Sequence, residues 1–369
     1  LPQQPTINAA MGNKQRPRAA WAEIIAWICV LLLWASAASA YIDPRIFGFA
    51  AVMGLAFPVF LGLVGLITVV LLFFARQKIW IPLVGLTVCF GAVRRYCPFN
   101  FKSTPPKTAI KVISYNTLFL GGPSNNPETG NNIVAEYIER SKADIACLQE
   151  VPSFDGYYEQ RVFPVMKHAK YHDGLLFNGV FIAMFSHYPI VRHELVCQDE
   201  GNGTVAFWTV RAPGDTILVI NNHLKSVGLS MEDREEFKEM VYAPESKMSR
   251  QGSKTILSKI THAAAARAAM ADKVAAFIDR HRGTPMIVCG DFNDTPISYA
   301  YRRVGKDLTD AYVSTGRGFG RSFNRDAIFV RIDQMFCSEE FTPYAAYVDT
   351  KMKCSDHYPI VSYFEPTKK

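Results

Sequence analysis

The sequence of 369 residues has few acidic residues in its first hundred and almost no net charge in the remainder. Residues 1–100 hold only two acids, Glu23 and Asp43, and residues 46–75 hold no charged side chain. Of the 40 basic and 33 acidic residues, 8 and 2 lie in residues 1–100, which leaves 32 and 31 for residues 101–369. The formal net charge of +7 therefore comes almost entirely from the first hundred residues. The composition of the nearly neutral remainder predicts no nucleic-acid partner.

Internal repeats, low-complexity tracts and closely spaced cysteine pairs are also missing. No C-x-x-C motif occurs among the eight cysteines, and Cys147 and Cys289 lie inside apolar, strand-like runs. The cysteines therefore indicate neither a zinc site nor a compartment. A hydrophobic content of 49% with 20% charged residues excludes a disordered or collagen-like chain.

Three apolar stretches predict a transmembrane region at residues 21–97. The first, at about 21–40, has the twenty or so apolar residues that a bilayer core requires of a helix. The second, 46–75, suits one long or tilted span bent at Pro58, and the third, 79–93, is short for a crossing. A buried helical hairpin of a soluble protein would not need thirty uncharged residues in succession. A cleaved signal peptide would not be followed by two more apolar stretches.

Basic residues around these stretches predict their orientation, because Lys and Arg favour the cytoplasmic side. Five of them precede the first stretch or separate the second from the third: Lys14, Arg16, Arg18, Arg76 and Lys78. Three spans then make residues 1–20 a cytoplasmic tail and place the C-terminal domain outside, at a plasma or inner membrane. Four more basic residues follow the third stretch and would favour the cytoplasm if that stretch only dips into the interface: Arg94, Arg95, Lys102 and Lys107.

Residues 98–108, which include Pro105 and Pro106, have no periodicity and predict an extended linker. Residues 109–369 alternate β-branched apolar runs with helical patterns, which predicts a layered α/β domain rich in strands. We expect strands at 110–115, 144–149, 180–185, 205–210, 216–221, 286–289 and 332–337. We expect helices at 131–141 and 262–282.

Polar residues gather where these apolar runs end, and the ends of strands are where loops converge and sites are usually built. Taken singly, each group has an ordinary structural explanation, since Asn116 could cap a turn and Glu150 could be a surface acid. Six groups share this position: Ser114–Asn116, Leu148–Val151, Asn221–Leu224, Gly290–Asp294, Arg331–Asp333 and Ser355–Pro359.

These residue types have a shared chemistry. The carboxylates are hard oxygen donors with no cysteine near them, which suits Mg²⁺ or Mn²⁺ holding several waters. Such an ion polarises a phosphoryl oxygen, while His223 and His357 can titrate near neutral pH. The set therefore predicts hydrolysis of a phosphoester. The carboxylates concerned are Glu150, Asp291, Asp333 and Asp356.

In this order, the motifs resemble those of the endonuclease/exonuclease/phosphatase superfamily, whose members include DNase I, abasic-site endonucleases, neutral sphingomyelinases and inositol-polyphosphate 5-phosphatases. The motifs are the strand asparagine, Gln-Glu-Val, His-Leu, Gly-Asp-x-Asn, Ile-Asp and Ser-Asp-His-x-Pro-Ile, and the resemblance covers about residues 109–366. It implies a DNase I-like, four-layered α/β sandwich of two packed mixed β-sheets with outer helices. About three transmembrane helices would precede this sandwich.

The resemblance also implies roles for the metal side of the site. Glu150 would be the chief ligand of Mg²⁺ or Mn²⁺, with Asn116 beside it and Asp356 supporting the metal. Asp291 and Asn293 would position or activate the attacking water.

On the phosphate side, the resemblance implies that His357 contacts the phosphate and is oriented by Asp333. His223 would stabilise charge or act as an acid, and whether Asp291 or His357 is the base varies within such families. Lys225 and Ser226 either touch a phosphate or belong to a solvated loop.

One position departs from the nuclease pattern. Abasic-site endonucleases carry an acid two residues after the strand asparagine, whereas this chain has Leu118, which puts a second metal position in doubt. Residues 229–260 combine charge with an amphipathic pattern directly after a site motif. They predict either a helical lid or membrane-facing segment that selects substrate, or a solvated surface excursion.

The leading functional prediction is a membrane-tethered phosphodiesterase or phosphatase that acts on a phosphoester such as a lipid head group. A short linker would hold the site near the bilayer and raise its effective concentration toward head groups. A nuclease acting on DNA or RNA is the alternative, against which the neutral charge of the domain counts. A silent binding module has no need of both proton carriers and a metal cage. No protein partner is implied.

Overall fold

The N-terminal apolar residues form a bundle of helices in the computed structural model, which describes residues 17–121, 125–152, 156–228, 233, 247–325 and 328–367. Two of the helices, α1 and α3, are long and apolar enough to cross a membrane, and a third span results if the pair bent by 68° at α4 and α5 is counted as one. The helices of this region are α1 (Pro17–Ala38), α2 (Phe49–Leu55), α3 (Phe57–Phe74), α4 (Trp80–Val88) and α5 (Phe90–Tyr96).

Large apolar side chains point outward on this bundle, as they do on helices that face lipid rather than water. Ile24 is 60% exposed, Leu66 is 62% exposed and Val88 is 66% exposed. The bend expected at Pro58 takes another form, because α2 ends at Leu55 and Pro58 lies in the first turn of α3. Proline's missing N–H costs nothing in a first turn, so Pro58 starts a helix instead of bending one.

Twelve of the described strands form two six-stranded sheets, each with one parallel pair near its centre, and β10 (Phe323–Arg325) pairs with β11 (Ile328–Val330) in a separate hairpin. In the first sheet the order is β13 (Phe341–Val348), β14 (Ile360–Pro366), β1 (Ile110–Asn116), β2 (Ile145–Val151), β4 (Val180–Ser186) and β3 (Tyr171–Phe177). In the second it is β5 (Ile190–Asp199), β6 (Asn202–Ala212), β7 (Asp215–His223), β8 (Met286–Asp291), β12 (Asp333–Cys337) and β9 (Thr309–Asp310).

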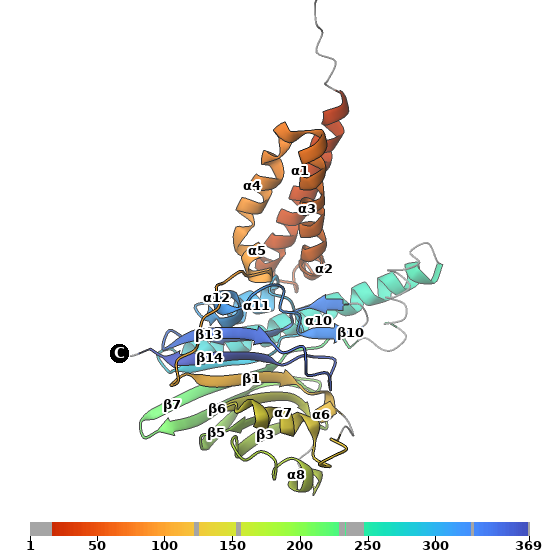
Figure 1. The fold of residues 1–369 in the computed structure, drawn as a ribbon. Coiled ribbons are helices and arrows are strands. Elements are labelled where there is room, and N and C mark those ends of the chain that lie inside the picture. Colours follow the sequence, from red (N-terminus) through yellow and green to blue (C-terminus); the bar gives the residue numbers. More distant parts are fainter. Residues whose placement is uncertain are drawn as a thin grey trace, which may run out of the picture.

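The two sheets pack face to face, and helices cover their outer faces (Figure 1). The central core joins side chains such as Val112 of β1 and Val219 of β7. Helices α7 (Ile133–Ser141) and α8 (Gly156–Arg161) cover the first sheet, and α10 (Lys247–Arg280) and α11 (Tyr299–Val304) cover the second. The expected four-layered sandwich of two mixed sheets is confirmed. Four smaller elements are also described: α6 (Leu118–Gly121), α12 (Ala311–Thr315) and the hairpin strands β10 and β11.

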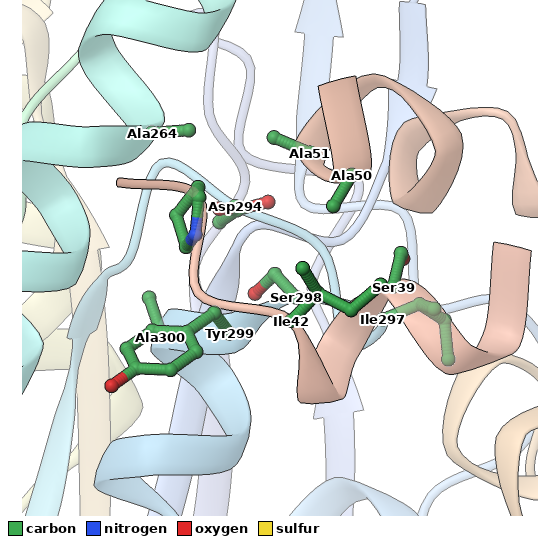
Figure 2. Close-up of a pocket in the computed structure, with 11 residues that line it drawn as sticks. Ser39, Ile42, Ala50, Ala51, Ala264, Asp294, Ile297, Ser298, Tyr299 and Ala300 are labelled. Atoms are coloured by element: carbon green, nitrogen blue, oxygen red, sulfur yellow. The ribbon is translucent and has the colours of Figure 1, made fainter. Parts of the chain in front are cut away.

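The bundle lies directly on the sandwich (Figure 1). In the bundle, α2 approaches the loop after β8 so closely that a Cβ on Gly54 would lie 2.4 Å from Ile297 O. Arg45 Nη2 bonds Asp272 Oδ2 of α10 at 2.6 Å, and Arg331 Nη2 donates to Arg95 O of α5 at 2.6 Å. Figure 2 shows this seam, where side chains of the bundle and of the loop after β8 line one small cavity.

The segment expected to be an extended linker, 98–108, has no helix or strand but is attached to the sandwich. Gly318 N donates to Pro98 O at 2.8 Å, and Asn100 Nδ2 donates to Gly316 O at 2.7 Å. The bundle and the sandwich are therefore joined by contacts along the seam as well as by the chain.

Candidate active site

Five strands bring their polar ends to one edge of the sandwich. Strands β1 and β2 run parallel in the first sheet, and β7 and β8 run parallel in the second, so four carboxyl ends meet there. The antiparallel strand β12 contributes its first residue to the same edge. In the register, His223 lies opposite Asp291, and Asp291 lies opposite Asp333. Strand pairing alone therefore makes three of the predicted site residues neighbours.

Gly290 allows β7 and β8 to approach each other just before Asp291. Its φ is +132°, and a Cβ at this position would lie 2.0 Å from Asn222 O. Only glycine adopts such a conformation without strain. The glycine of the Gly-Asp-x-Asn motif thus sets the position of Asp291.

Asn116 joins the two sheets through one amide group. Its Nδ2 donates to Glu150 Oε1 at 3.0 Å and to Asp291 Oδ2 at 3.0 Å. Glu150 has a φ of +52° at the place where the pairing of β2 with β4 is interrupted between Leu148 and Val151. A bulge of this kind redirects a side chain, and here it turns Glu150 toward the site. Burial raises the pKa of the Glu150 carboxyl, while the hydrogen bond from Asn116 lowers it.

His357 forms a buried pair with Asp333. Its Nδ1 lies 2.9 Å from Asp333 Oδ2, and its Nε2 lies 3.6 Å from Asp291 Oδ2. Burial by itself lowers the pKa of His357, but the carboxylates of Asp333 and Asp291 raise it to about 10. An imidazolium is therefore held at neutral pH with one N–H directed at Asp333 and the other toward the site.

His223 lies on the opposite side of Asp291. Its Nε2 is 3.5 Å from Glu150 Oε1, 3.9 Å from Asp291 Oδ2 and 3.2 Å from Asn202 Nδ2. Burial lowers the pKa of His223, so this ring favours the neutral form. The two histidines beside Asp291 thus favour different protonation states.

Asn293 fixes the orientation of Asp291. Its backbone N donates to Asp291 Oδ1 at 2.8 Å, and its Nδ2 donates to Leu224 O at 2.9 Å. The next residue, Asp294, is buried against Arg267 of α10, with Nε to Oδ2 at 3.1 Å. Burial raises the pKa of Asp294, and Arg267 lowers it.

Three further predicted site residues already have partners in the structure. Asp356 Oδ2 accepts a hydrogen bond from Arg325 Nη1 at 3.1 Å, so a guanidinium already offsets its charge. Lys225 Nζ pairs with Glu200 Oε2 at 2.6 Å, and Ser226 Oγ accepts from Gly228 N at 3.3 Å. Most of the predicted lid, 229–260, lies outside the described residues. Its described end, from residue 247, is the first part of α10.

Buried amides form a polar layer beneath these side chains that the sequence analysis did not select. Gln149 Nε2 donates to Asn221 Oδ1 at 2.6 Å across the two sheets, and Asn221 Nδ2 donates to Leu148 O at 3.1 Å. Asn222 Nδ2 donates to Cys289 O at 2.9 Å. Their place inside two of the polar segments was a usable signal, because a fully buried amide in a strand needs a partner.

Other neighbours of the site had no sequence signal. Asn202 follows a turn and reaches His223 only because β6 pairs with β7. Phe323 of β10 meets the ring of His357 edge-on, with centroids 5.1 Å apart, and Arg325 reaches Asp356 from the same strand. A short hairpin far from these residues in the sequence gives no local indication of such contacts.

The donor set fits a hard divalent cation. Glu150, Asp291 and Asp333 offer carboxylate oxygens, and Asp333 Oδ1 is buried without a hydrogen-bond partner among the described residues. Ligand atoms of Asp291, Asp333 and His357 lie within 4.8 Å of one another. Because His357 favours the protonated form, its ring suits a phosphate better than a metal. The carboxylate oxygens around Glu150 and Asp291 are the better match for Mg²⁺ or Mn²⁺.

Comparison with known families adds an independent observation. A model of the Endonuclease/Exonuclease/phosphatase family matches residues 113–357, which is more than half of the chain. A model of a domain of unknown function (DUF8431) matches residues 20–96. No curated protein matches the chain.

Several solved structures are similar. Truncated TDP2 from Caenorhabditis elegans is 18% identical with a TM-score of 0.48, over 69% of this chain and 97% of that one. The human Nocturnin catalytic domain with bound sulfate is 18% identical with a TM-score of 0.48, over 72% and 100%. Sphingomyelinase C from Streptomyces griseocarneus is 16% identical with a TM-score of 0.42, over 70% and 99%.

Proposed function

Because the chain belongs to the endonuclease/exonuclease/phosphatase family, whose members hydrolyse phosphoester bonds, we propose that it is a membrane-anchored phosphoesterase dependent on Mg²⁺ or Mn²⁺. The bond that it cleaves is a phosphodiester or phosphomonoester of a lipid head group. One observation supports this proposal most directly: Asn116 donates to both Glu150 and Asp291, while His357 and Asp333 lie across from them. Carboxylate oxygens and a charged imidazolium then lie close together at this edge of the sandwich.

His357 binds the phosphate in this proposal. Asp333 accepts from Nδ1 and holds the ring, so Nε2–H is available to a phosphoryl oxygen. A charged donor held by a buried carboxylate stabilises the negative charge that develops on that oxygen. Asp333 therefore acts through His357 as a positioning residue.

Asp291 and Asn293 orient the attacking water. Asp291 Oδ2 lies between the two histidines and accepts from Asn116, while Asn293 N holds Oδ1. A carboxylate fixed in this way can accept the proton of a water bound next to it. His223, which favours the neutral form, supplies a second nitrogen that takes up or returns a proton on the same side.

The metal would be held by Glu150, with Asn116 beside it and Asp356 in a supporting position. A divalent ion bound there polarises the phosphoryl group and stabilises the leaving oxygen. The hydrogen bond from Asn116 orients the Glu150 carboxylate toward the site. The bulge in β2 gives the backbone the direction that this orientation needs.

The apolar bundle anchors the enzyme in a membrane. Arg76 and Lys78 lie between α3 and α4 at the end of the bundle away from the sandwich (Figure 1), and Lys78 Nζ pairs with Glu23 Oε2 at 2.6 Å near the start of α1. The excess of positive charge at that end favours the cytoplasm for it. The sandwich then lies on the extracytoplasmic side of a plasma or inner membrane, next to the head groups.

The test uses the full chain in lipid nanodiscs, because the bundle and the sandwich share a seam. Purified protein with Mg²⁺, Mn²⁺ or EDTA is assayed on sphingomyelin, glycerophospholipids, inositol phosphates, DNA and RNA. We expect turnover of a lipid that EDTA abolishes and that is lost in Asp291→Asn and His357→Ala. Turnover of nucleic acid but of no lipid would show that the protein is a nuclease. Turnover that EDTA does not affect would show that the reaction does not depend on a metal ion.

A further inference from the structure

A groove of about 820 Å³ lies between the linker and the edge of the first sheet, apart from the catalytic residues. We call it the linker groove. Linker residues 102–105 form one wall, and β13 with the loop after α12 forms the other. Six of the lining side chains are basic or aromatic: Lys102, Arg317, Arg321, Tyr312, Tyr347 and Tyr363.

The groove is basic. Lys102, Arg317 and Arg321 contribute three positive charges, and none of the described residues that line it is Asp or Glu. The nearest acids along the chain have other partners. Asp349 accepts from Tyr137 Oη at 3.1 Å, and Glu365 accepts from Thr108 Oγ1 at 2.8 Å. Among the described residues, Lys102 and Arg317 therefore meet no acid in the lining of the groove.

The linker groove lies next to the part of the bundle that meets the sandwich. Figure 1 shows α12 and β13 below α5, and the linker runs from α5 past both. Phe99 is 70% exposed and Phe101 is 86% exposed, and Arg317 lies 5.3 Å from the centre of the Phe99 ring. Phe319, which is 58% exposed, meets Tyr96 at the end of α5. Exposed aromatic rings beside basic residues are the composition of a membrane interface.

We propose that the linker groove binds the head group of an anionic phospholipid from the leaflet that borders the sandwich. Lys102 and Arg317 pair with the phosphate, and the exposed side chains of Phe99 and Phe101 enter the acyl boundary beside it. The inference rests on the membrane anchoring in the proposed function but not on the catalytic chemistry.

A bound lipid at this position would help to fix how the catalytic edge faces the bilayer. Arg321 donates to Asn324 and lies 3.4 Å from Tyr358 Oη, so the wall of the groove continues into the segment that carries His357. Arg321 therefore connects the groove to the segment that carries His357, although the lipid in the groove is not the one that is cleaved.

The test measures binding of phosphatidylglycerol and phosphatidylcholine to the full chain in uncharged detergent, by native mass spectrometry. The double variant Lys102→Gln/Arg317→Gln changes two exposed side chains and leaves the fold intact. Each basic residue near an anionic head group contributes about a factor of five, so phosphatidylglycerol affinity should fall roughly 25-fold. Binding of phosphatidylcholine should be weak and unchanged.

The matched control is Arg280→Gln/Lys306→Gln, which removes the same charge from exposed positions on the side of the second sheet, where Arg280 also lies against a phenylalanine. Equal phosphatidylglycerol binding by wild type and the groove variant, or an equal loss in the control, would overturn the proposal. Displacement of the lipid by an equal concentration of inorganic phosphate would also overturn it. The catalytic assay on the same proteins keeps the two proposals apart, because groove-dependent binding without hydrolysis rejects only the catalytic one.

Discussion

The pair formed by Asp333 and His357 shows how a buried carboxylate sets the charge of its neighbour. Burial alone would favour a neutral imidazole, yet Asp333 and Asp291 together raise the pKa of His357 to about 10. The proton on His357 is then retained across the physiological range and lost only as the pH rises through that value. In the proposed mechanism, a substrate phosphate would meet a charged donor throughout this range.

Asp333→Asn should move the alkaline limb of the pH–activity profile to lower pH. Without the Asp333 charge, the effect of burial, which lowers the pKa of His357, is less strongly opposed, so the proton is lost earlier. We also expect kcat/KM to fall by roughly 100-fold, a typical effect of losing a positioned proton carrier. The measurement is kcat/KM against pH for both proteins on the lipid identified as substrate. An unchanged alkaline limb would show that His357 does not carry the essential proton.

The variant Glu150→Gln tests the proposal that Glu150 binds the metal ion. The Gln oxygen can still accept from Asn116, so the fold should persist, while the lost carboxylate charge should weaken Mn²⁺ binding by tenfold or more, roughly 1.4 kcal/mol. Titration followed by the electron paramagnetic resonance of free Mn²⁺ measures this directly. Glu159→Gln, an exposed acid on α8, is the control and should bind Mn²⁺ as the wild type does. Equal Mn²⁺ affinity in Glu150→Gln would remove Glu150 from the metal site.

At the scale of the strands, the parallel pairing of β7 with β8 requires a glycine at one position. Gly290 lies where a Cβ would be 2.0 Å from Asn222 O. The same contact aligns His223 with Asp291. The geometry of the site therefore depends on one residue that has no side chain.

Gly290→Ala should force β7 and β8 apart and lower the free energy of unfolding by about 3 kcal/mol or more. Thermal unfolding of the full chain followed by circular dichroism measures the loss. Gly156→Ala is the matched control, since nothing lies within 4 Å of its Cβ position and it begins α8. If both variants melted together, the close approach of the two strands would not be a requirement of the fold.

All seven expected strands are present, whereas the edge strands β3, β5, β9 and β13 and the inner strand β14 were not predicted. The expected run at 216–221 became β7 and the run at 286–289 became β8, each extended by the polar residues of the site. Edge strands β3 and β5 were not predicted, because their exposed and buried positions do not alternate regularly. Helix α10 begins at Lys247, earlier than the expected 262, so its first turns include the end of the segment 229–260 that was predicted as a helical lid or a surface excursion.

Across the whole molecule, the seam joins the apolar bundle to the loop that follows Asp291. The loop after Asp291 runs through Asp294 to Ile297, and Ile297 meets α2 of the bundle (Figure 2). Arg267 holds the same loop from α10 by pairing with Asp294. A change at Ile297 in the seam should therefore alter the position of Asp291, six residues earlier in the chain.

Gly54→Val should open the seam, because a Cβ at this position would lie 2.4 Å from Ile297 O. We expect a loss of about 2 kcal/mol in unfolding free energy and faster proteolysis of the linker, together with lower activity. Limited trypsin digestion in nanodiscs gives the readout. Gly62→Val on α3 has nothing within 4 Å and should behave as wild type. Equal digestion of both variants would mean that the bundle and the sandwich are not coupled at this contact.

Local pattern was sufficient for the sandwich, the apolar helices and the polar groups at strand ends, because side-chain period and apolar run length follow from backbone geometry. Tertiary structure alone decided three other features: that Asn116 bridges two sheets, that Asp356 pairs with Arg325, and that residues 98–108 attach to the sandwich. Each of these is a contact between residues more than thirty positions apart. Such contacts depend on how strands pair and helices dock, and no local sequence pattern records that.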